Sequence, residues 1–252
     1  MSRRIAKLYP EQNVGLALPF SAGGVLANMA TLLAGKTLVN LNYTASAEAL
    51  QYACKESGIT RVLTARRFIS NLQKRGIELS ELLPDQELIY LEDMREGFSK
   101  AESLVTLLKV ILLPSALLKK LICKKHMPEQ AAIIFSSGSE GLPKGIVLSH
   151  KNLMANTKQA ADALQPDAND VMMSSLPLFH AFGLTAAQFL PLIEGIPMVC
   201  QPDPTDVVSV AKAAAKYKTT IMFGTSTFLR FYCRNSKAVS YTHLTLPTIY
   251  SV

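Results

Sequence analysis

Cysteines and long apolar runs are scarce in this sequence. Its four cysteines lie far apart with no C-x-x-C spacing, which argues against a zinc site or a disulfide framework and fits a reducing compartment. No segment reaches the roughly 18 consecutive apolar residues that a membrane-spanning helix needs, and the N-terminal MSRRIAKLYPEQ lacks the apolar core of a signal peptide. These absences predict a cytoplasmic protein.

Acidic residues are the minority among the charged ones. The chain has 19 aspartates and glutamates against 26 lysines and arginines, for a net charge of +7. The basic residues are scattered apart from short clusters, and no recognition pattern of aromatic and basic residues accompanies them. We therefore expect no nucleic-acid partner, and we interpret the charge as favouring an acidic partner or an anionic membrane surface.

The common glycine motifs for nucleotides are also missing. The only Gly-Lys-Thr begins at Gly35, and Ala30 stands where a Walker A loop needs its first glycine. The surrounding pattern predicts a helix before it and a strand after it, which is the reverse of the order in a P-loop. The G-x-G-x-x-G pattern of dinucleotide-binding folds is absent as well.

What the sequence does contain is a regular alternation of apolar strands and helices punctuated by glycine. The predicted strands cover 13–20, 37–42, 61–65, 171–178 and 219–225, and the predicted helices cover 24–34, 45–58, 150–164 and 205–217. This alternation predicts an α/β fold in which helices are layered on largely parallel sheets.

The leucine-rich segment 101–125 does not follow this alternation of strands and helices. Pro114 interrupts it, and it ends in Lys119, Lys120, Lys124 and Lys125. One interpretation is a pair of interfacial helices that rests on an anionic membrane surface. The other is a connecting helix packed on the domain with its lysines in solvent.

A loop rich in serine and glycine lies between two apolar runs, in the stretch IIFSSGSEGLPKGIVLSH at 133–150. Its glycines let backbone N–H groups close on an anion, while the serine hydroxyls and Lys144 add donors suited to phosphate. The composition fits a polyphosphate site. A hairpin turn without a ligand is the alternative that composition alone leaves open.

The order of residues in this loop, SSGSEGLPKG at 136–145, resembles the phosphate-binding signature of the adenylate-forming (AMP-dependent) synthetases. Two further stretches look like motifs of that family, LPLFHAFGL at 176–184 and IMFGTSTFL at 221–229. The resemblance extends from Asn13 to about Asn235. It implies the layered parallel sheets of a partial N-terminal adenylation domain, with ATP and Mg²⁺ as cofactors.

Glu140 indicates which subgroup of this family the chain resembles. Most acyl-CoA ligases carry Thr or Ser at this position, whereas GSEG together with VNLNYTAS and QPDPTD looks like the acyl-carrier-protein synthetase module of bacterial bifunctional 2-acylglycerophosphoethanolamine acyltransferases. That module implies a long-chain fatty acid and acyl carrier protein, or CoA, as partners, and a protein peripheral to or fused to the bacterial inner membrane. The alternatives are an acyl-CoA or aryl-CoA ligase fragment and a non-catalytic remnant that binds lipid or a partner.

The resemblance also implies roles for individual residues. A fatty carboxylate attacks the α-phosphorus of ATP to form acyl-AMP, and a thiol then takes the acyl group. Lys144 and His180 are assigned as catalytic, Lys144 for charge on the leaving pyrophosphate and His180 for orienting the carboxylate. Gly183 and Thr225 join His180 at the substrate, and no metal-ligating side chain is assigned. The predicted phosphate-binding residues are Ser136, Ser137, Gly138, Ser139, Glu140, Gly141, Lys144 and Gly145. For His180, a buried histidine satisfied by the backbone is the alternative.

Several parts of the family pattern are missing. They are the Tyr-Gly-x-Thr-Glu motif, the aspartate that binds ribose, and the C-terminal domain with its catalytic lysine. We therefore expect residues 1–238 to be a partial N-terminal AMP-binding domain that cannot complete adenylation by itself. Residues 239–252 resemble the translation of a sequencing adapter, and we expect them to lie outside the natural protein.

Overall fold

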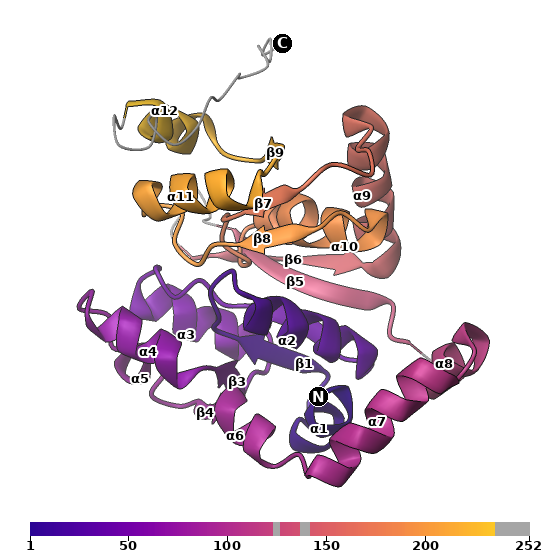
Figure 1. Ribbon diagram of the computed structural model, residues 1–252. Coiled ribbons are helices and arrows are strands. Elements are labelled where there is room, and N and C mark those ends of the chain that lie inside the picture. The colour runs from indigo at the N-terminus through magenta and orange to yellow at the C-terminus, as the bar shows by residue number, and fades with distance from the viewer. Residues whose placement is uncertain (123–126, 137–141, 235–252) are drawn as a thin grey trace. The chain divides into compact units, whose positions relative to one another are not determined.

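The computed structural model describes residues 1–122, 127–136 and 142–234 (Figure 1). The chain divides into two compact units, one formed by residues 1–155 and 178–181, the other by residues 156–177 and the chain from Phe182 onward. The predicted domain boundary at 238 falls outside the described residues and stays a prediction.

The first unit is built on a six-stranded sheet in the order β4-β3-β1-β2-β5-β6. Its strands are β1 (Asn13–Leu16), β2 (Thr37–Asn40), β3 (Arg61–Thr64), β4 (Glu87–Tyr90), β5 (Gln130–Ser136) and β6 (Lys144–Ser149). Neighbouring strands pair in parallel, except that β6 returns antiparallel beside β5. Parallel neighbours require crossover connections, and the helices between the strands supply them.

The helices of the first unit are α1 (Ser2–Leu8), α2 (Ala22–Leu33), α3 (Ala47–Glu56), α4 (Arg66–Gln73), α5 (Leu79–Leu82), α6 (Leu91–Glu96), α7 (Lys100–Leu112) and α8 (Ser115–Ile122). Serine side chains cap the start of three of them, α2, α3 and α7. The Oγ atoms of Ser21 and Ser46 each accept a hydrogen bond from the backbone N–H three residues on, and Ser99 forms a capping box with Glu102. These caps satisfy N–H groups that the first turn of a helix leaves unpaired.

One hydrophobic cluster joins the sheet of the first unit to α3, α4 and α5. It contains Val39 of β2, Ile133 of β5 and Phe68 of α4. Phe179, from the segment 178–181, is buried in the same cluster, and its ring meets Tyr43 edge-on with the centroids 5.0 Å apart. Burial of this aromatic side chain explains why a segment distant in sequence belongs to the first unit.

The second unit holds a three-stranded parallel sheet in the order β8-β7-β9. Its strands are β7 (Met172–Ser174), β8 (Met198–Cys200) and β9 (Ile221–Met222), and its helical elements are the later part of α9 (His150–Leu164), the π-helix η1 (Gly183–Phe189), α10 (Leu190–Glu194), α11 (Val207–Tyr217) and α12 (Ser226–Arg234). Met172 and Met173 are neighbours on β7 and belong to two different apolar clusters. Because successive strand residues point to opposite faces, the sheet is covered on both sides.

The predicted fold class is confirmed, since helices alternate with parallel strands in both units. The helix α9 has the predicted bounds, and α7 and α8 flank Pro114 as a helix pair. The strands are shorter than predicted, because apolar residues such as Leu18 and Phe20 are buried beyond the end of β1. No helix within the described ranges is both long and apolar enough to cross a bilayer.

Candidate functional site

The two residues that flank the Ser/Gly loop lie opposite each other. Ser136 ends β5, Lys144 begins β6, and the antiparallel register pairs them directly. The predicted phosphate-binding residues between them, Ser137, Gly138, Ser139, Glu140 and Gly141, lie outside the described residues. The hairpin therefore brings the start and the end of the predicted signature together at one end of the sheet.

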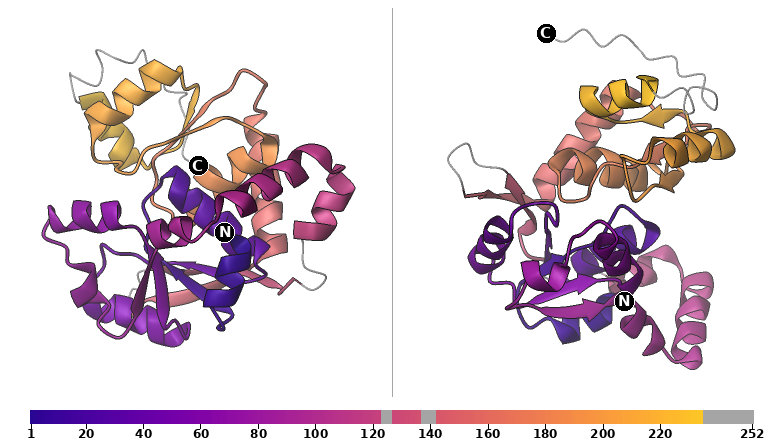
Figure 2. Two further views of the ribbon diagram at one scale, coloured as in Figure 1. Left: turned by 60° about the horizontal axis from the view of Figure 1, so that its bottom comes forward. Right: turned by 90° about the vertical axis from the view of Figure 1, so that its left-hand side faces the viewer.

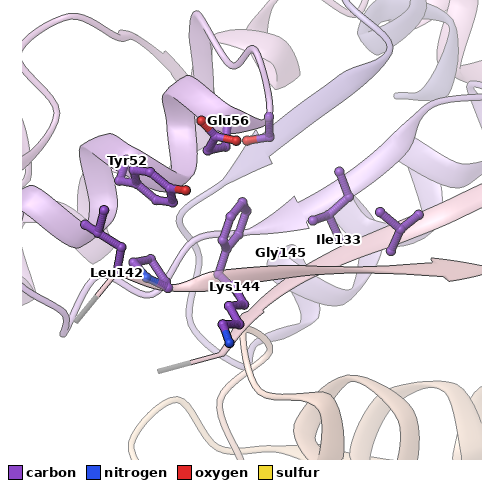
Figure 3. Close-up of a pocket in the computed structure, with 10 residues that line it drawn as sticks. Tyr52, Glu56, Ile133, Leu142, Lys144 and Gly145 are labelled. Carbon is purple, nitrogen blue, oxygen red and sulfur yellow. The ribbon is translucent and has the colours of Figure 1, made fainter. Parts of the chain in front are cut away.

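Strand alternation gives this hairpin two different faces. Ser136 and Lys144 share one face, and the next pair, Phe135 and Gly145, share the other. Figure 3 shows the Lys144 side chain extending on the far side of the strand from Tyr52. Lys144 is exposed, and no carboxylate in the part of the chain that the structure describes forms an ion pair with it. Its ammonium group is thus available to an anion from solvent.

A hollow of about 540 Å³ opens beside the hairpin, on the face that carries Phe135 (Figure 3). Its lining includes Tyr52, Glu56, Ile133, Phe135, Leu142 and Val147. The carboxylate of Glu56 disfavours phosphate here, and the Lys144 ammonium extends away from this face. Lys144 and Gly145 also line the hollow, so it adjoins the candidate phosphate site.

Gly145 lets an aromatic ring lie across the hairpin. A Cβ atom at this position would come within 3.1 Å of Cε1 of Phe135, closer than ordinary van der Waals contact. The missing side chain brings the ring of β5 close to the backbone of β6. In this structure Gly145 therefore has a packing role, and its predicted contact with phosphate stays a prediction.

His180 lies in the short segment that returns to the first unit. Its ring packs against Phe179 with the centroids 4.6 Å apart, and Phe179 is itself only 4% exposed. The residue as a whole is exposed, so the alternative of a buried histidine is wrong. Partial burial of the ring lowers the pKa of His180 below its ordinary value, because the charged imidazolium loses hydration. The imidazole is therefore neutral at about pH 7.

The two remaining predicted substrate residues belong to the second unit. A Cβ atom on Gly183 would lie 2.0 Å from the carbonyl oxygen of Pro177, so only glycine fits at the start of η1. The Thr225 side-chain oxygen accepts a 3.4 Å hydrogen bond from the N–H of Phe228, which places Thr225 at the start of α12. Both positions therefore have a local structural role, and their contact with substrate stays a prediction.

Asn40 is a candidate functional residue that the sequence analysis did not single out. It ends β2 beside β5, is only 6% exposed, and neither its amide nitrogen nor its amide oxygen has a hydrogen-bond partner within the described chain. Burying an unpaired amide costs about 1–3 kcal/mol, so an uncompensated Asn40 requires an explanation. An asparagine within the apolar run TLVNLN was the available signal.

The described residues fit a polyphosphate better than they fit a bare metal ion. Ser136 supplies a hydroxyl group and Lys144 supplies an ammonium group, and both can donate hydrogen bonds to phosphate oxygens. No group of three or more His, Cys, Asp or Glu side chains that could hold a metal occurs in ranges 1–122, 127–136 and 142–234. Mg²⁺ is commonly held by substrate phosphates and one or two carboxylates, so its binding here would depend on the oxygens of a bound polyphosphate.

These features agree with a match to a known family. The family model described as "AMP-binding enzyme" matches residues 4–249. Since this match covers nearly the whole sequence, the chain belongs to the AMP-binding enzyme family. The predicted adenylate-forming resemblance is confirmed at this level.

Curated proteins and a solved structure support the same conclusion. The chain is 24% identical over 265 residues to a long-chain-fatty-acid–CoA ligase of Yersinia pestis, a match covering 94% of this chain and 45% of that protein. It is 27% identical over 201 residues to the acyl-CoA ligase sidI of Aspergillus fumigatus, covering 77% of this chain and 34% of that protein. The chain thus spans less than half the length of either relative.

The fold is shared with O-succinylbenzoate coenzyme A synthetase from Bacillus subtilis, solved in complex with ATP and magnesium ion. The TM-score is 0.70 at 21% identity, and the match covers 93% of this chain and 57% of that chain. At this identity the likeness shows the fold alone. It matches the mixed α/β architecture described above.

Proposed function

We propose that this chain is the nucleotide-binding N-terminal part of an ATP-dependent ligase that activates a long-chain fatty acid. The observation that carries the proposal is the pairing of Ser136 with Lys144 at the mouth of the Ser/Gly loop, in a chain of the AMP-binding enzyme family. The long-chain-fatty-acid ligase among the relatives supports the fatty-acid substrate.

Lys144 acts in this proposal on the phosphates of ATP. Its exposed ammonium binds the β- and γ-phosphate oxygens, and the Ser136 hydroxyl donates alongside it. As the fatty carboxylate attacks the α-phosphorus and the bond to pyrophosphate breaks, the negative charge on the departing pyrophosphate must be stabilised, and a positioned lysine does this electrostatically. Mg²⁺, when bound with ATP, supplies further charge neutralisation. Residues 137–141 are the further proposed phosphate contacts.

His180 acts in the proposal on the fatty carboxylate. Its lowered pKa keeps the imidazole neutral, so a ring N–H can donate a hydrogen bond that orients the carboxylate without forming a tight ion pair. Packing against Phe179 restricts the orientation of the ring. Gly183 and Thr225 are the further proposed substrate contacts.

Binding of ATP to the 252-residue chain tests the proposal. Isothermal titration calorimetry should detect ATP binding to the wild type. The Lys144→Gln variant should bind roughly tenfold to a hundredfold more weakly, because a hydrogen bond to a charged group contributes about 1.5–3 kcal/mol. Lys151→Gln is the control, since Lys151 is also exposed but lies on α9, outside the hairpin. Equal affinities of the two variants, or no ATP binding at all, would overturn the proposal.

Pyrophosphate exchange separates binding from catalysis. We expect no ATP–pyrophosphate exchange by this chain with any fatty acid, because the Tyr-Gly-x-Thr-Glu motif and the C-terminal catalytic lysine are missing from the sequence. Measurable exchange would show that this chain suffices for adenylation.

For the second half-reaction we propose acyl carrier protein as the acceptor, with re-acylation of lysophospholipid as the use of the product. Glu140 and the stretches VNLNYTAS and QPDPTD support this choice. CoA is the rival acceptor, and the names of both curated relatives favour it. Thioester formation by the complete natural protein, measured with holo-acyl carrier protein and with CoA at equal concentration, decides between them. Faster transfer to CoA would reject the carrier-protein proposal.

A further inference from the structure

The helix α7 exposes apolar side chains along its whole length. None of its residues is buried, so the alternative of a helix packed on the domain is wrong for α7. The large exposed side chains are Leu104, Val105, Leu107, Leu108, Val110, Ile111 and Leu112, with exposed fractions from 45% to 72%. Folded monomers rarely leave a contiguous apolar patch of this kind in water unless it binds something.

The apolar side chains of α7 extend beyond one narrow stripe. At about 100° per residue, they lie within an arc of roughly 220° from Val110 through Leu104 to Val105, which Ser103 and Lys100 interrupt. The other polar residues of the helix are Glu102, Thr106 and Lys109. A helix that packs against a protein needs an apolar stripe of about 100°. The additional exposed apolar side chains suit a helix that lies partly immersed in an apolar layer.

The helix α8 adds positive charge to this surface. Leu117 and Leu121 are exposed on it, and Lys119 and Lys120 are exposed between them. From residue 100 to residue 122 the sequence contains four lysines and one glutamate. A basic, apolar surface of this kind is complementary to anionic lipid headgroups above an acyl layer.

The start of α7 is firmly attached to the first unit. The Arg4 guanidinium lies 4.4 Å from the ring centroid of Phe98 and donates a hydrogen bond to the carbonyl of Gly97. The capping box of Ser99 follows directly. Both views in Figure 2 show the helix pair on the outside of the first unit.

The dimensions of the helix pair fit a position on a membrane rather than across it. The 13 residues of α7 extend for about 20 Å, which is less than the roughly 30 Å of a hydrocarbon core. Pro114 then interrupts the helix before α8 begins. A short apolar helix followed by a basic one can lie in the interface with its lysines at the headgroups.

From these observations we infer that α7 and α8 form a docking surface for an anionic lipid membrane. This inference rests on the helix pair alone and is independent of the phosphate site. α7 enters the boundary between headgroups and acyl chains, while Lys109, Lys119 and Lys120 contact the anionic headgroups.

Co-sedimentation with vesicles tests the inference on the full chain. The probes are vesicles of phosphatidylcholine with and without phosphatidylglycerol. We expect binding at least about tenfold tighter to the anionic vesicles and decreasing with salt, since each lysine near such a surface contributes about 1 kcal/mol, or roughly fivefold.

Two variants remove the two parts of the surface separately. Leu108→Ser/Ile111→Ser/Leu112→Ser and Lys109→Gln/Lys119→Gln/Lys120→Gln should each weaken binding by about tenfold or more. The matched controls are Leu26→Ser/Met154→Ser/Leu192→Ser, which changes exposed apolar residues elsewhere, and Lys55→Gln/Lys74→Gln/Lys151→Gln. Both controls should bind like the wild type. Far-ultraviolet circular dichroism checks that every variant is folded, and the α7 variant should fold because its changes are all exposed.

Three results would overturn the inference. Equal binding to neutral and anionic vesicles would show that the lysines do not contribute to binding. Normal binding by the α7 serine variant would show that the exposed apolar side chains of α7 do not contribute. Self-association in sedimentation velocity that the α7 serine variant abolishes, without vesicle binding by the wild type, would assign the surface to a second copy of this chain.

Discussion

The backbone at Gly183 passes so close to Pro177 that a Cβ atom there would lie 2.0 Å from the Pro177 carbonyl oxygen. The clash is with backbone, which has no alternative rotamer, so we expect Gly183→Ala to lower the free energy of unfolding by about 3 kcal/mol. Urea denaturation monitored by circular dichroism measures the change. The control is Gly23→Ala in α2, where the nearest contact would be an ordinary 3.4 Å. That variant should be neutral or slightly stabilised, and equal stabilities of the two would contradict the prediction.

The pKa of His180 gives a prediction about pH. Burial lowers this pKa in the folded state, so between the folded value and the unfolded value of about 6.5 the unfolded chain binds more protons. The contribution of His180 to stability is therefore complete above about pH 6.5 and decreases as the pH falls through this window. Burial lowers the pKa of His150 as well.

Two measurements check this behaviour. An NMR titration of the imidazole protons should give a midpoint for His180 below that of a model peptide. In denaturation experiments from about pH 5 to pH 7, the His180→Gln variant should retain a reduced pH dependence, because His150 still contributes. A midpoint for His180 above the peptide value would reject the argument.

The cysteines are predicted to differ sharply in reactivity. Cys54 is fully buried, and burial raises its pKa to about 12, so the thiolate is scarcely populated. Cys233 is exposed. With iodoacetamide at about pH 8, peptide mass spectrometry should find Cys233 alkylated while Cys54 is unmodified. In concentrated guanidinium chloride the two should react alike. Equal reaction in the native protein would contradict the burial of Cys54.

Asn40 provides a test of the buried amide beside β5. Replacing it with leucine, which has a similar volume, removes two polar atoms without partners, so Asn40→Leu should raise the free energy of unfolding by about 1 kcal/mol. Asn42→Leu is the matched control, because its Oδ1 accepts hydrogen bonds from the N–H and the hydroxyl of Thr44. The control should lose stability. A loss of stability in Asn40→Leu would show that the amide has a partner in solution.

The alternation of strands and helices was predictable because buried strands and amphipathic helices have distinct periodicities over ten or more residues. The helix α9 and the break at Pro114 carried such signals. The antiparallel direction of β6 carried no such signal, since an apolar run has the same pattern in a parallel and in an antiparallel strand. The short elements α5 and β8 were missed because four or three residues hold too little pattern.

The candidate site was predictable as a set of motifs but not as an arrangement. The signature named Ser136 and Lys144, whereas their direct pairing follows from the register of the hairpin. The contact between Gly145 and Phe135 required that register too. The burial of Asn40 depends on tertiary packing around β2, which no local pattern encodes.

The place of Phe179 in the first unit has a consequence for how the chain is made. Residues leave the ribosome in sequence order, and domains tend to fold as they emerge. Phe179, which contacts Tyr43 together with Phe68, is synthesised only after α9 and β7. A nascent chain that has just completed α8 and the β5–β6 hairpin therefore still lacks part of its core. The first unit can finish folding only after translation has passed well into the second.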